Sequence, residues 1–452
     1  MRIKNRDELV EVLGEKAENA IEILEEGLKA ADPYEAVLKT LKLKGSEVFV
    51  RDLRAEVKGR VFVVGAGKAS GRMAEAVESI LGELINEGIV IVPRGTANRY
   101  KVKRIHLWEA DHPIPSKSGV EGASRILELV RELKEDDVLI VLISGGGSAL
   151  MPLPANDISI EEKQKLTDLL LKSGASIEEI NTVRKHVSRI KGGWLAYNAY
   201  PATVVSLIIS DVVGDPMNMI ASGPTVPDPT TFKDAYKILT KYGLLDRVPS
   251  TIRGYIEEGV KGAHPETPKP GSKVFSKVYN TIIASNNISL SAMKKKANSL
   301  GYNAIILTSF LEGEAREVGS VVASIGKEIL VHDRPVKKPA VVLFGGETTV
   351  TIRGHGRGGR NQELVLSAAI KIKGLKDILI ASIGSDGIDG VTDAAGAMVD
   401  GETVLRAERE NIDPEQYLLN NDSYTFFKKV GGLVYTGPTG TNVNDFTMIL
   451  IK

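Results

Sequence analysis

Two glycine-rich segments, each following a short apolar run, carry the residues best suited to binding an anion. The first, residues 65–71 (GAGKASG), follows the run 61–65 (VFVVG). Glycine lets the backbone turn tightly, and amides at the start of a following helix attract an oxyanion. Lys68 adds a mobile positive charge. The segment matches neither GxxxxGK[ST] nor GxGxxG, because Ser70 stands at the third glycine position. We predict an anion site that includes Gly65, Gly67 and Ser70, with a simple tight turn as the alternative.

The second segment, residues 144–149 (SGGGSA), follows the run 138–143 (VLIVLI). Consecutive glycines at a strand end expose several backbone amides, and such a nest suits phosphate or carboxylate oxygens. The flanking serines can add hydroxyl donors. A crowded turn between a strand and a helix is the alternative. The predicted binding residues are Ser144, Gly145, Gly146, Gly147 and Ser148.

A third apolar run, residues 204–210 (VVSLIIS), ends at Asp211. In an open parallel sheet, ligands bind outside the carboxyl ends of the strands. At such a place Asp211 can act as general base toward a hydroxyl or help to hold Mg²⁺. A lone aspartate of this kind is as often a helix cap, and its glycine-rich surroundings favour the functional reading.

The second half of the chain contains a basic, glycine-rich segment, residues 353–363 (RGHGRGGRNQE). It comes shortly after the run 341–344, which leads into Glu347. The planar fork of arginine binds phosphate or carboxylate at two points, and glycines would let the loop close on a ligand. We therefore predict that Arg360, Asn361 and Glu347 take part in binding. A solvated charged loop is the alternative.

Three acidic residues follow the run 378–383, within GSDGIDGVTD. Carboxylates grouped among glycines at a strand end can coordinate Mg²⁺ together with a nucleotide. The spacing is not that of an EF-hand, because no glutamate stands at the last position of the loop. We predict Asp386 and Asp389 as metal ligands.

Other chemistries find less support. The six histidines form no HxxH or HExxH pair, no GxSxG elbow is present, and the chain has no cysteine. Disulfides, thiolate catalysis and cysteine-ligated zinc are thereby excluded. Asp111-His112-Pro113 is compatible with a catalytic dyad, although a structured turn is the preferred interpretation.

The apolar runs alternate with helix-like stretches, a pattern typical of βαβ units. The chain of 452 residues is too long for one ordinary core. We therefore predict an α/β protein of two domains with mainly parallel sheets, the first Rossmann-like. The expected boundaries are 1–245 and 276–452, and the proline-rich stretch 246–275 is interpreted as a linker.

The composition of the chain limits the binding partners and the cellular location that we expect. Lys plus Arg and Asp plus Glu number 58 each, which argues against a surface built for nucleic acid or for an anionic membrane. No stretch has the ~20 apolar residues of a membrane helix, and the first ten residues are too charged for a signal peptide. We expect a cytosolic protein. Sparse glutamine and abundant lysine and glutamate lean toward a thermophilic source.

Seven motifs, taken in order, resemble the class II glycerate kinases, a family with an N-terminal glycerate kinase domain and a C-terminal MOFRL domain. The resemblance covers essentially the whole chain. It implies ATP and Mg²⁺ as cofactors, D-glycerate as substrate, 2-phosphoglycerate as the usual product, and an active site in the cleft between two α/β domains. The motifs are GAGKAS (65–70), SGGGSALMPLP (144–154), SDVVGDP (210–216), ASGPTVPD (221–228), GGRNQE (358–363), GSDGIDGVTDAAGA (384–397) and TGPTGTNVND (436–445).

The resemblance also assigns roles as hypotheses. The functional lysine of the family corresponds to Lys68 and its cleft arginine to Arg360. Lys68 would neutralise the transferring phosphoryl group or fix the glycerate carboxylate, and Arg360 would complement it from the other domain. Asp211 would orient or deprotonate the glycerate hydroxyl. Glu347 and Asp386 would hold metal or nucleotide.

Three other functions stay open. An NAD(P)H-dependent hydroxypyruvate reductase would use Gly65, Gly67 and Gly71 as a loosened dinucleotide loop, with Arg94 at an NADP 2′-phosphate. A non-catalytic regulator that binds phosphosugars would use the same anion loops. A kinase for another small hydroxy acid would keep the chemistry and change the substrate. A homodimer is plausible, although nothing in the sequence indicates it.

Overall fold

The computed structural model describes residues 3–452, which divide into two compact units. One unit is the continuous segment Pro33–Ile283, and the other joins the N-terminal segment up to Asp32 to Ala284–Lys452. This division differs from the sequence-based boundaries at both ends of the first domain. The reason at the N-terminus is packing: helix α2 (Glu15–Ala30) lies against α12 (Asn286–Ser299), where Glu22 forms an ion pair with Lys296 (2.6 Å).

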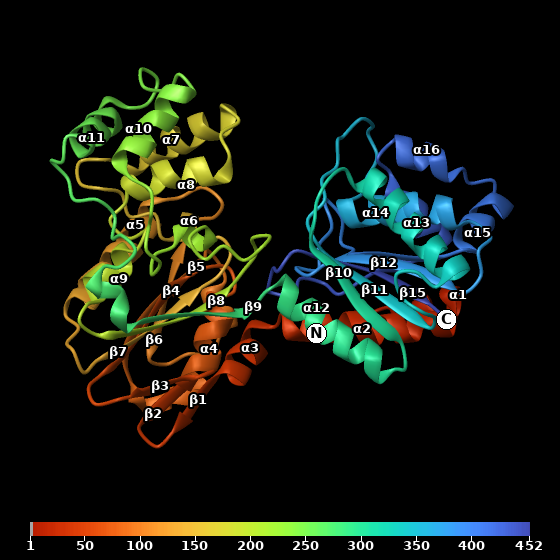
Figure 1. Ribbon diagram of the computed structural model, residues 1–452, viewed down its shortest axis with the longest axis horizontal. Helices are drawn as coiled ribbons and strands as arrows, with labels where there is room; N and C mark the ends of the chain where they lie inside the picture. The colour runs from red at the N-terminus through yellow and green to blue at the C-terminus, as the bar shows by residue number, and fades with distance from the viewer. Residues whose placement is uncertain (1–2) are drawn as a thin grey trace. The chain divides into compact units, whose positions relative to one another are not determined.

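The Pro33–Ile283 unit is built on a six-stranded sheet in the order β6-β5-β4-β7-β8-β9 (Figure 1). The pairings from β6 through β8 are parallel, as predicted. Every residue of β4 and β7 is buried, the pattern of strands covered on both faces. The strands are β4 (Val61–Ala66), β5 (Ile85–Pro93), β6 (Ile105–Ala110), β7 (Val138–Ile143), β8 (Thr203–Ile209) and β9 (Val278–Ala284).

Several helices, four 3₁₀ turns and a small sheet complete this part of the unit. The antiparallel sheet β1-β2-β3 and the strand β6 were not predicted. The elements are β1 (Leu41–Lys44), β2 (Glu47–Val50), β3 (Leu53–Glu56), α3 (Pro33–Thr40), α4 (Ser70–Leu81), α5 (Lys117–Arg131), α6 (Gly147–Leu150) and α9 (Trp194–Ala199), with the 3₁₀ turns η1 (Gly82–Leu84), η2 (Ala97–Arg99), η3 (Ile220–Ser222) and η4 (Lys273–Lys277).

Four helices form a separate layer of the same unit beyond the sheet (Figure 1). They are α7 (Ile160–Lys172), α8 (Ile177–His186), α10 (Phe232–Lys241) and α11 (Ser250–Val260). They share an apolar core that includes Leu166, Leu239 and Ile256. The interpretation of 246–275 as a linker needs correction, because α11 contributes Ile252 and Ile256 to this core. The prolines around α11 mask its helical pattern in the sequence.

The second unit has a mixed six-stranded sheet in the order β10-β11-β15-β12-β13-β14. Only β10 and β11 pair in parallel, and the other pairings are antiparallel. The α/β class is confirmed, but this second sheet is not mainly parallel. Strand β15 lies antiparallel between β11 and β12, and β12 returns to β13 through a loop without a crossover helix. The strands are β10 (Asn303–Leu311), β11 (Ala340–Gly346), β12 (Ile378–Gly384), β13 (Gly396–Asp400), β14 (Leu433–Val434) and β15 (Asp445–Ile451).

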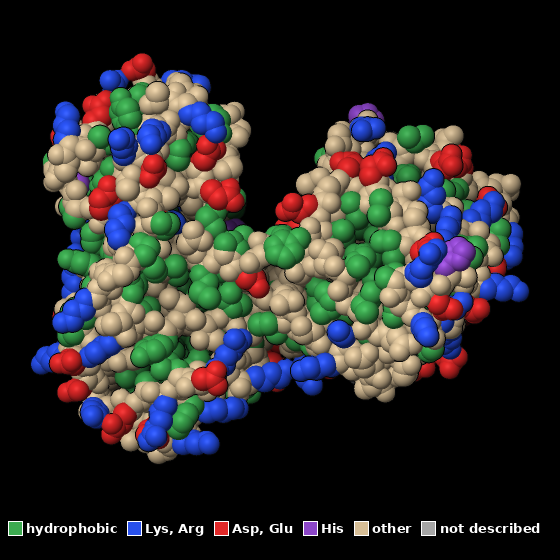
Figure 2. All heavy atoms as spheres, viewed as in Figure 1, with side chains coloured by type: hydrophobic (Ala, Val, Ile, Leu, Met, Phe, Trp, Pro, Cys, Tyr) green, Lys and Arg blue, Asp and Glu red, His purple; other side chains and the backbone are tan. Residues whose placement is uncertain are grey.

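Helices cover both faces of this second sheet, with α13 and α14 on one face and α2 and α12 on the other (Figure 1). Its helices are α1 (Arg6–Leu13), α2, α12, α13 (Ala315–His332), α14 (Arg360–Ile372), α15 (Thr403–Arg409), α16 (Pro414–Leu419) and α17 (Ser423–Val430). Basic and acidic side chains are mixed over the visible face of each unit (Figure 2). Among residues 3–452, no helix has the length and apolar character needed to cross a bilayer.

Candidate active site

The two predicted glycine loops of the Pro33–Ile283 unit interlock at the carboxyl ends of β4 and β7. These strands are parallel neighbours with Ala66 opposite Ile143, so the residues that follow them meet. The amide of Lys68 donates to the carbonyl of Gly145 (2.9 Å), and the amide of Ala69 donates to Ser144 Oγ (3.0 Å). The loops therefore form one rigid platform.

Ser70 and Ser144 hold this platform together, which differs from the expected ligand contacts. Both residues are buried, and their hydroxyl oxygens lie 3.1 Å apart. The Ser70 hydroxyl also reaches the carbonyl of Leu142 (3.3 Å). The sequence predicted these hydroxyls as ligand donors, but in the structure they form hydrogen bonds within the protein.

Glycine is required at two points because the strands approach so closely. A Cβ atom at Gly65 would lie 2.1 Å from the Leu142 carbonyl oxygen. Gly67 has a φ of +151°, and a Cβ atom there would lie 2.0 Å from Ser144 Oγ. These two glycines therefore allow the close approach of the neighbouring strand, and they leave no space for a ligand at their own positions.

Lys68 and Asp211 flank the next pair of glycines. Lys68 is exposed although its neighbours in the loop are buried. A Cβ atom at Gly146 would lie 3.3 Å from Lys68 Cε, and one at Gly145 would lie 2.1 Å from Asp211 Oδ2. The structure thus brings together the predicted base, the predicted lysine and the glycine nest. This arrangement offers backbone amides, one cation and one carboxylate to a small anionic ligand.

His112 is a further residue of this group, although the sequence favoured a turn for its segment. Its ring would lie 2.9 Å from a Cβ atom at Gly146. Partial burial and the positive charge of Lys68 lower the pKa of His112. The available sequence signal for His112 was its position after an apolar segment. That segment is β6, which was not predicted as a strand from the sequence.

The closeness of Lys68 and His112 gives a testable pKa effect. In Lys68→Met we expect the pKa of His112 to rise, because the lysine charge no longer repels the imidazolium. The pKa stays below its ordinary value, since partial burial remains. NMR titration of the His112 ring protons, assigned with His112→Gln, measures the change. An unchanged pKa in Lys68→Met would contradict this placement of the lysine.

Ser148 does not serve as the predicted hydroxyl donor to a ligand. Its oxygen accepts hydrogen bonds from Arg184 NH2 (2.7 Å) and Lys191 Nζ (2.8 Å). It also lies 2.9 Å from Ser222 Oγ, which donates to Asn181 Oδ1 (2.7 Å). A hydroxyl has one proton and two lone pairs, so these protein contacts use its full capacity. Neither Arg184 nor Lys191 carries a motif that the sequence could reveal.

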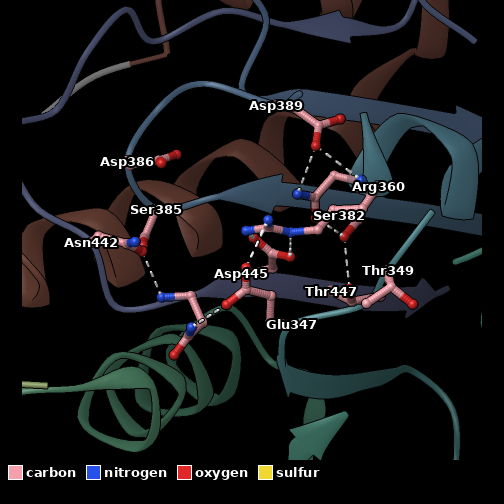
Figure 3. A network of polar contacts seen from close by, with 12 residues as sticks. Glu347, Thr349, Arg360, Ser382, Ser385, Asp386, Asp389, Asn442, Asp445 and Thr447 are labelled. Carbon is pink, nitrogen blue, oxygen red and sulfur yellow. Dashed lines mark hydrogen bonds and ion pairs between the residues drawn. The ribbon is translucent and has the colours of Figure 1, made fainter. Parts of the chain in front are cut away.

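In the second unit, Arg360 lies at the start of α14 between two carboxylates (Figure 3). Its Nε and NH2 groups donate to Asp445 (2.6 and 2.9 Å), and its NH1 group pairs with Glu347 (2.8 Å). Glu347 in turn accepts from Asn444 Nδ2 (2.9 Å). Arg360 is therefore paired with two carboxylates. The sequence predicted a cation available to phosphate, and the structure does not show one at this position. Asp445 carried no assigned role in the sequence prediction.

Burial acts on both partners of this pair. Burial lowers the pKa of Arg360, but its hydrogen bond with Asp445 more than offsets this, so the pKa lies above its ordinary value and the cation is permanent. Burial raises the pKa of Asp445 to about 6, and the Arg360 guanidinium opposes that rise. The pair lies at the carboxyl end of β11, where Gly346 is opposite Asp445 and Glu347 follows the strand.

Asp389 is a helix cap, which corrects the prediction of a metal ligand. It is buried and accepts from the amides of Asn361 (3.1 Å) and Gln362 (2.9 Å). The side-chain amides of the same two residues also donate to it, at 3.2 and 2.9 Å. Asn361 is likewise buried and accepts from Ser382, so its side chain supports the helix start and is enclosed by protein.

Asp386 lies in the loop that follows β12. Its Oδ1 atom accepts from the amide of Ile388 (3.1 Å), and the residue is half-buried. Within residues 3–452 no group of three or more His, Cys, Asp or Glu side chains is arranged to hold a metal ion. Mg²⁺ in nucleotide sites is usually held by one or two carboxylates together with phosphate oxygens and water. A single residue such as Asp386 fits that mode, whereas Asp389 does not.

Comparison with known proteins places the chain in a family. Residues 19–257 match the family described as a domain of unknown function (DUF4147), and residues 340–445 match the MOFRL family. A Pyrococcus horikoshii protein named glycerate 2-kinase is 47% identical over 435 residues, which cover 96% of this chain and 97% of that protein. An Agrobacterium vitis protein named putative hydroxypyruvate reductase is 44% identical over 431 residues, covering 95% and 93%.

A solved structure agrees with these matches. The crystal structure of a Thermotoga maritima glycerate kinase superposes with a TM-score of 0.87 at 45% identity, covering 96% of this chain and 99% of that one. The chain belongs to the class II glycerate kinase family, which combines the DUF4147 and MOFRL domains. The resemblance seen in the seven motifs is thereby confirmed.

Proposed function

We propose that this protein transfers a phosphoryl group from ATP to D-glycerate and forms 2-phosphoglycerate. The observation that carries the proposal is the whole-chain identity of 47% with a protein named glycerate 2-kinase. The loops at the carboxyl ends of β4, β7 and β8 support it, because they gather Lys68, the glycine nest and Asp211. Phosphoryl transfer depends mainly on alignment and charge stabilisation, which such a set of groups supplies.

In the proposed reaction, the glycerate hydroxyl attacks the terminal phosphorus of ATP. Asp211 orients that hydroxyl and accepts its proton, while ADP leaves with its own bridging oxygen. Lys68 stabilises negative charge on the transferring group or fixes the glycerate carboxylate. The amides of Gly145 and Gly146 bind the remaining anionic oxygens, whereas the amide of Gly147 donates to the carbonyl of Ser144 (3.1 Å).

The Arg360 cluster has a different proposed role. With both carboxylates ionised, Arg360, Asp445 and Glu347 together carry an excess of negative charge, which does not suit a bare phosphate. We propose that Arg360 keeps Glu347 and Asp445 oriented toward the nucleotide and its metal, and that Asp386 contributes a ligand to Mg²⁺. When bound, Mg²⁺ would neutralise phosphate charge.

Two observations weigh against a reductase. Arg94, the candidate for an NADP 2′-phosphate, makes two hydrogen bonds to Asp111 (2.6 and 2.9 Å). A Cβ atom at Gly71 would lie 2.4 Å from the Tyr100 ring, so this glycine serves packing against an aromatic side chain. Neither group is arranged for a dinucleotide.

The position of the new phosphate is tested by proton-coupled phosphorus NMR of the product. A phosphate on C2 couples to the single C2 proton and gives a doublet, whereas a phosphate on C3 couples to two protons and gives a triplet. We expect the doublet. A triplet would retain the kinase but overturn the assignment of 2-phosphoglycerate.

A further inference from the structure

Three basic side chains converge behind the 144–149 loop, and within residues 3–452 no carboxylate pairs with them. Arg184, on α8, donates from NH2 to Ser148 Oγ (2.7 Å). Lys191 donates from Nζ to both Ser148 Oγ (2.8 Å) and the Ser148 carbonyl oxygen (2.7 Å). Lys163, on α7, donates to the carbonyl oxygen of Val187 (3.2 Å). All of these acceptors are neutral.

Such a group of buried basic side chains needs an explanation. The exposed fractions of Lys163 and Lys191 are 3% and 0%, and a buried charge without a partner is strongly disfavoured. Burial and the charges of their neighbours hold the pKa values of both lysines well below the ordinary value. Burial also lowers the pKa of Arg184, to about 10, so the guanidinium stays charged at neutral pH.

The hydrogen bond to Ser148 does not satisfy all the donors of the Arg184 guanidinium. The Nε atom of Arg184 is buried and has no hydrogen-bond partner in the described part of the chain. Unsatisfied buried donors are rare in native proteins, and an ion or water bound at the donor is one explanation for them. Ser148 cannot supply more, because its hydroxyl is already engaged by Lys191 and Ser222.

The position of Arg184 connects this group to the candidate site. Ser148 directly follows the Gly145–Gly147 nest, whose other side carries Lys68 and Asp211. Arg184 is partly exposed, whereas Lys163 and Lys191 are enclosed. Arg184 is therefore the member of this group that keeps some exposed surface, with the two lysines behind it.

We propose that Arg184 binds an anionic oxygen of a substrate, with the amines of Lys191 and Lys163 packed behind it. The planar guanidinium recognises carboxylate and phosphoryl oxygens alike, so the glycerate carboxylate and an ATP phosphate share the required chemistry. The assignment to glycerate or ATP rests on the proposed function, whereas the anion site itself does not.

The experiment compares Arg184→Met and Arg184→Lys with the wild type. Kinetics give kcat and separate KM values for D-glycerate and for ATP, and thermal unfolding in increasing inorganic phosphate reports anion binding without turnover. Arg104→Met is the matched control, because Arg104 lies in the same unit and its side chain is 42% exposed. Thermal unfolding without phosphate checks that each variant is folded.

In Arg184→Met we expect one KM to rise by about 10- to 100-fold, the loss typical of one charged hydrogen bond. A rise for glycerate assigns the carboxylate, and a rise for ATP assigns a phosphate. Arg184→Lys should fall between Arg184→Met and the wild type, because it keeps the charge and loses the fork. Phosphate should stabilise the wild type more than Arg184→Met.

A merely structural arginine gives a different pattern. If folded Arg184→Met keeps both KM values within about twofold and the full stabilisation by phosphate, the anion site is wrong. If the wild type does not phosphorylate glycerate at all, the proposed function fails. The difference in phosphate stabilisation between wild type and Arg184→Met then still decides whether the anion site exists.

Discussion

Lys68→Met is expected to lower kcat for glycerate phosphorylation by about 10²- to 10³-fold, the usual effect of removing one charged group from a transition state. Methionine keeps much of the side-chain length and removes the charge. The loop should persist, because its hydrogen bonds come from the backbone of Lys68 and from Ser144. Steady-state kinetics with saturating ATP and glycerate measure the loss.

The matched control for this variant is Lys172→Met. Lys172 lies on α7 in the same unit, its side chain is 72% exposed, and it pairs with Asp168 one helical turn away. Such pairs contribute little, so activity should stay near that of the wild type. If Lys68→Met is folded and turns over within about threefold of the wild type with unchanged KM values, Lys68 does not act on the transferring group.

Asp389→Ala is expected to destabilise the second unit by about 3–5 kcal/mol, because it strands several buried donors at once. The carboxylate accepts from the backbone and side-chain amides of Asn361 and Gln362. No water can replace it easily, since Asp389 is 1% exposed. The start of α14, and Arg360 with it, should become mobile. Hydrogen exchange of the 360–372 segment and thermal unfolding of the full chain measure the effect.

Asp413→Ala is the control for this prediction. Asp413 caps α16 in the same unit by accepting from the amide of Glu415 (3.0 Å), but it is exposed. Loss of an exposed cap costs about 0.5–2 kcal/mol, less than the loss at Asp389. If Asp389→Ala retains the unfolding behaviour and exchange protection of Asp413→Ala, the capping role is wrong. Retained Mg²⁺-dependent activity in a folded Asp389→Ala protein would agree with its exclusion as a metal ligand.

Much of the first sheet could be predicted from the sequence, because its strands are buried on both faces and read as continuous apolar runs. The run 138–143 coincides with β7, and the run 61–65 lies within β4. The glycine loops followed from the same reasoning, since polar residues after such strands meet at one edge of the sheet. As a result, Lys68 and Asp211 lie together at the same edge of the sheet.

Strand direction in the second sheet could not be predicted, because β13 and β14 are short and a pattern of apolar residues does not encode direction. Helix α11 was missed for a different reason, since prolines and glycines on both sides obscured its periodicity. These errors did not affect the family assignment, which depends on motifs at strand ends.

Side-chain roles at the site were harder to predict than side-chain positions. A sequence shows that Asp389 follows a strand, but it does not show that the carboxylate turns back onto the start of α14 instead of toward a ligand. Arg184 lies within a charged helix without a motif, and its burial beside Ser148 depends on packing between distant segments. Such roles follow only from three-dimensional contacts.

The most direct test of the central claim measures ADP release by the purified protein with ATP, Mg²⁺ and D-glycerate, next to a parallel reaction with hydroxypyruvate and NAD(P)H. Omission of glycerate controls for simple ATP hydrolysis. We predict ADP release that depends on glycerate and no consumption of NAD(P)H. Consumption of NAD(P)H without glycerate-dependent ADP release would contradict phosphoryl transfer and assign the 65–71 loop to a dinucleotide.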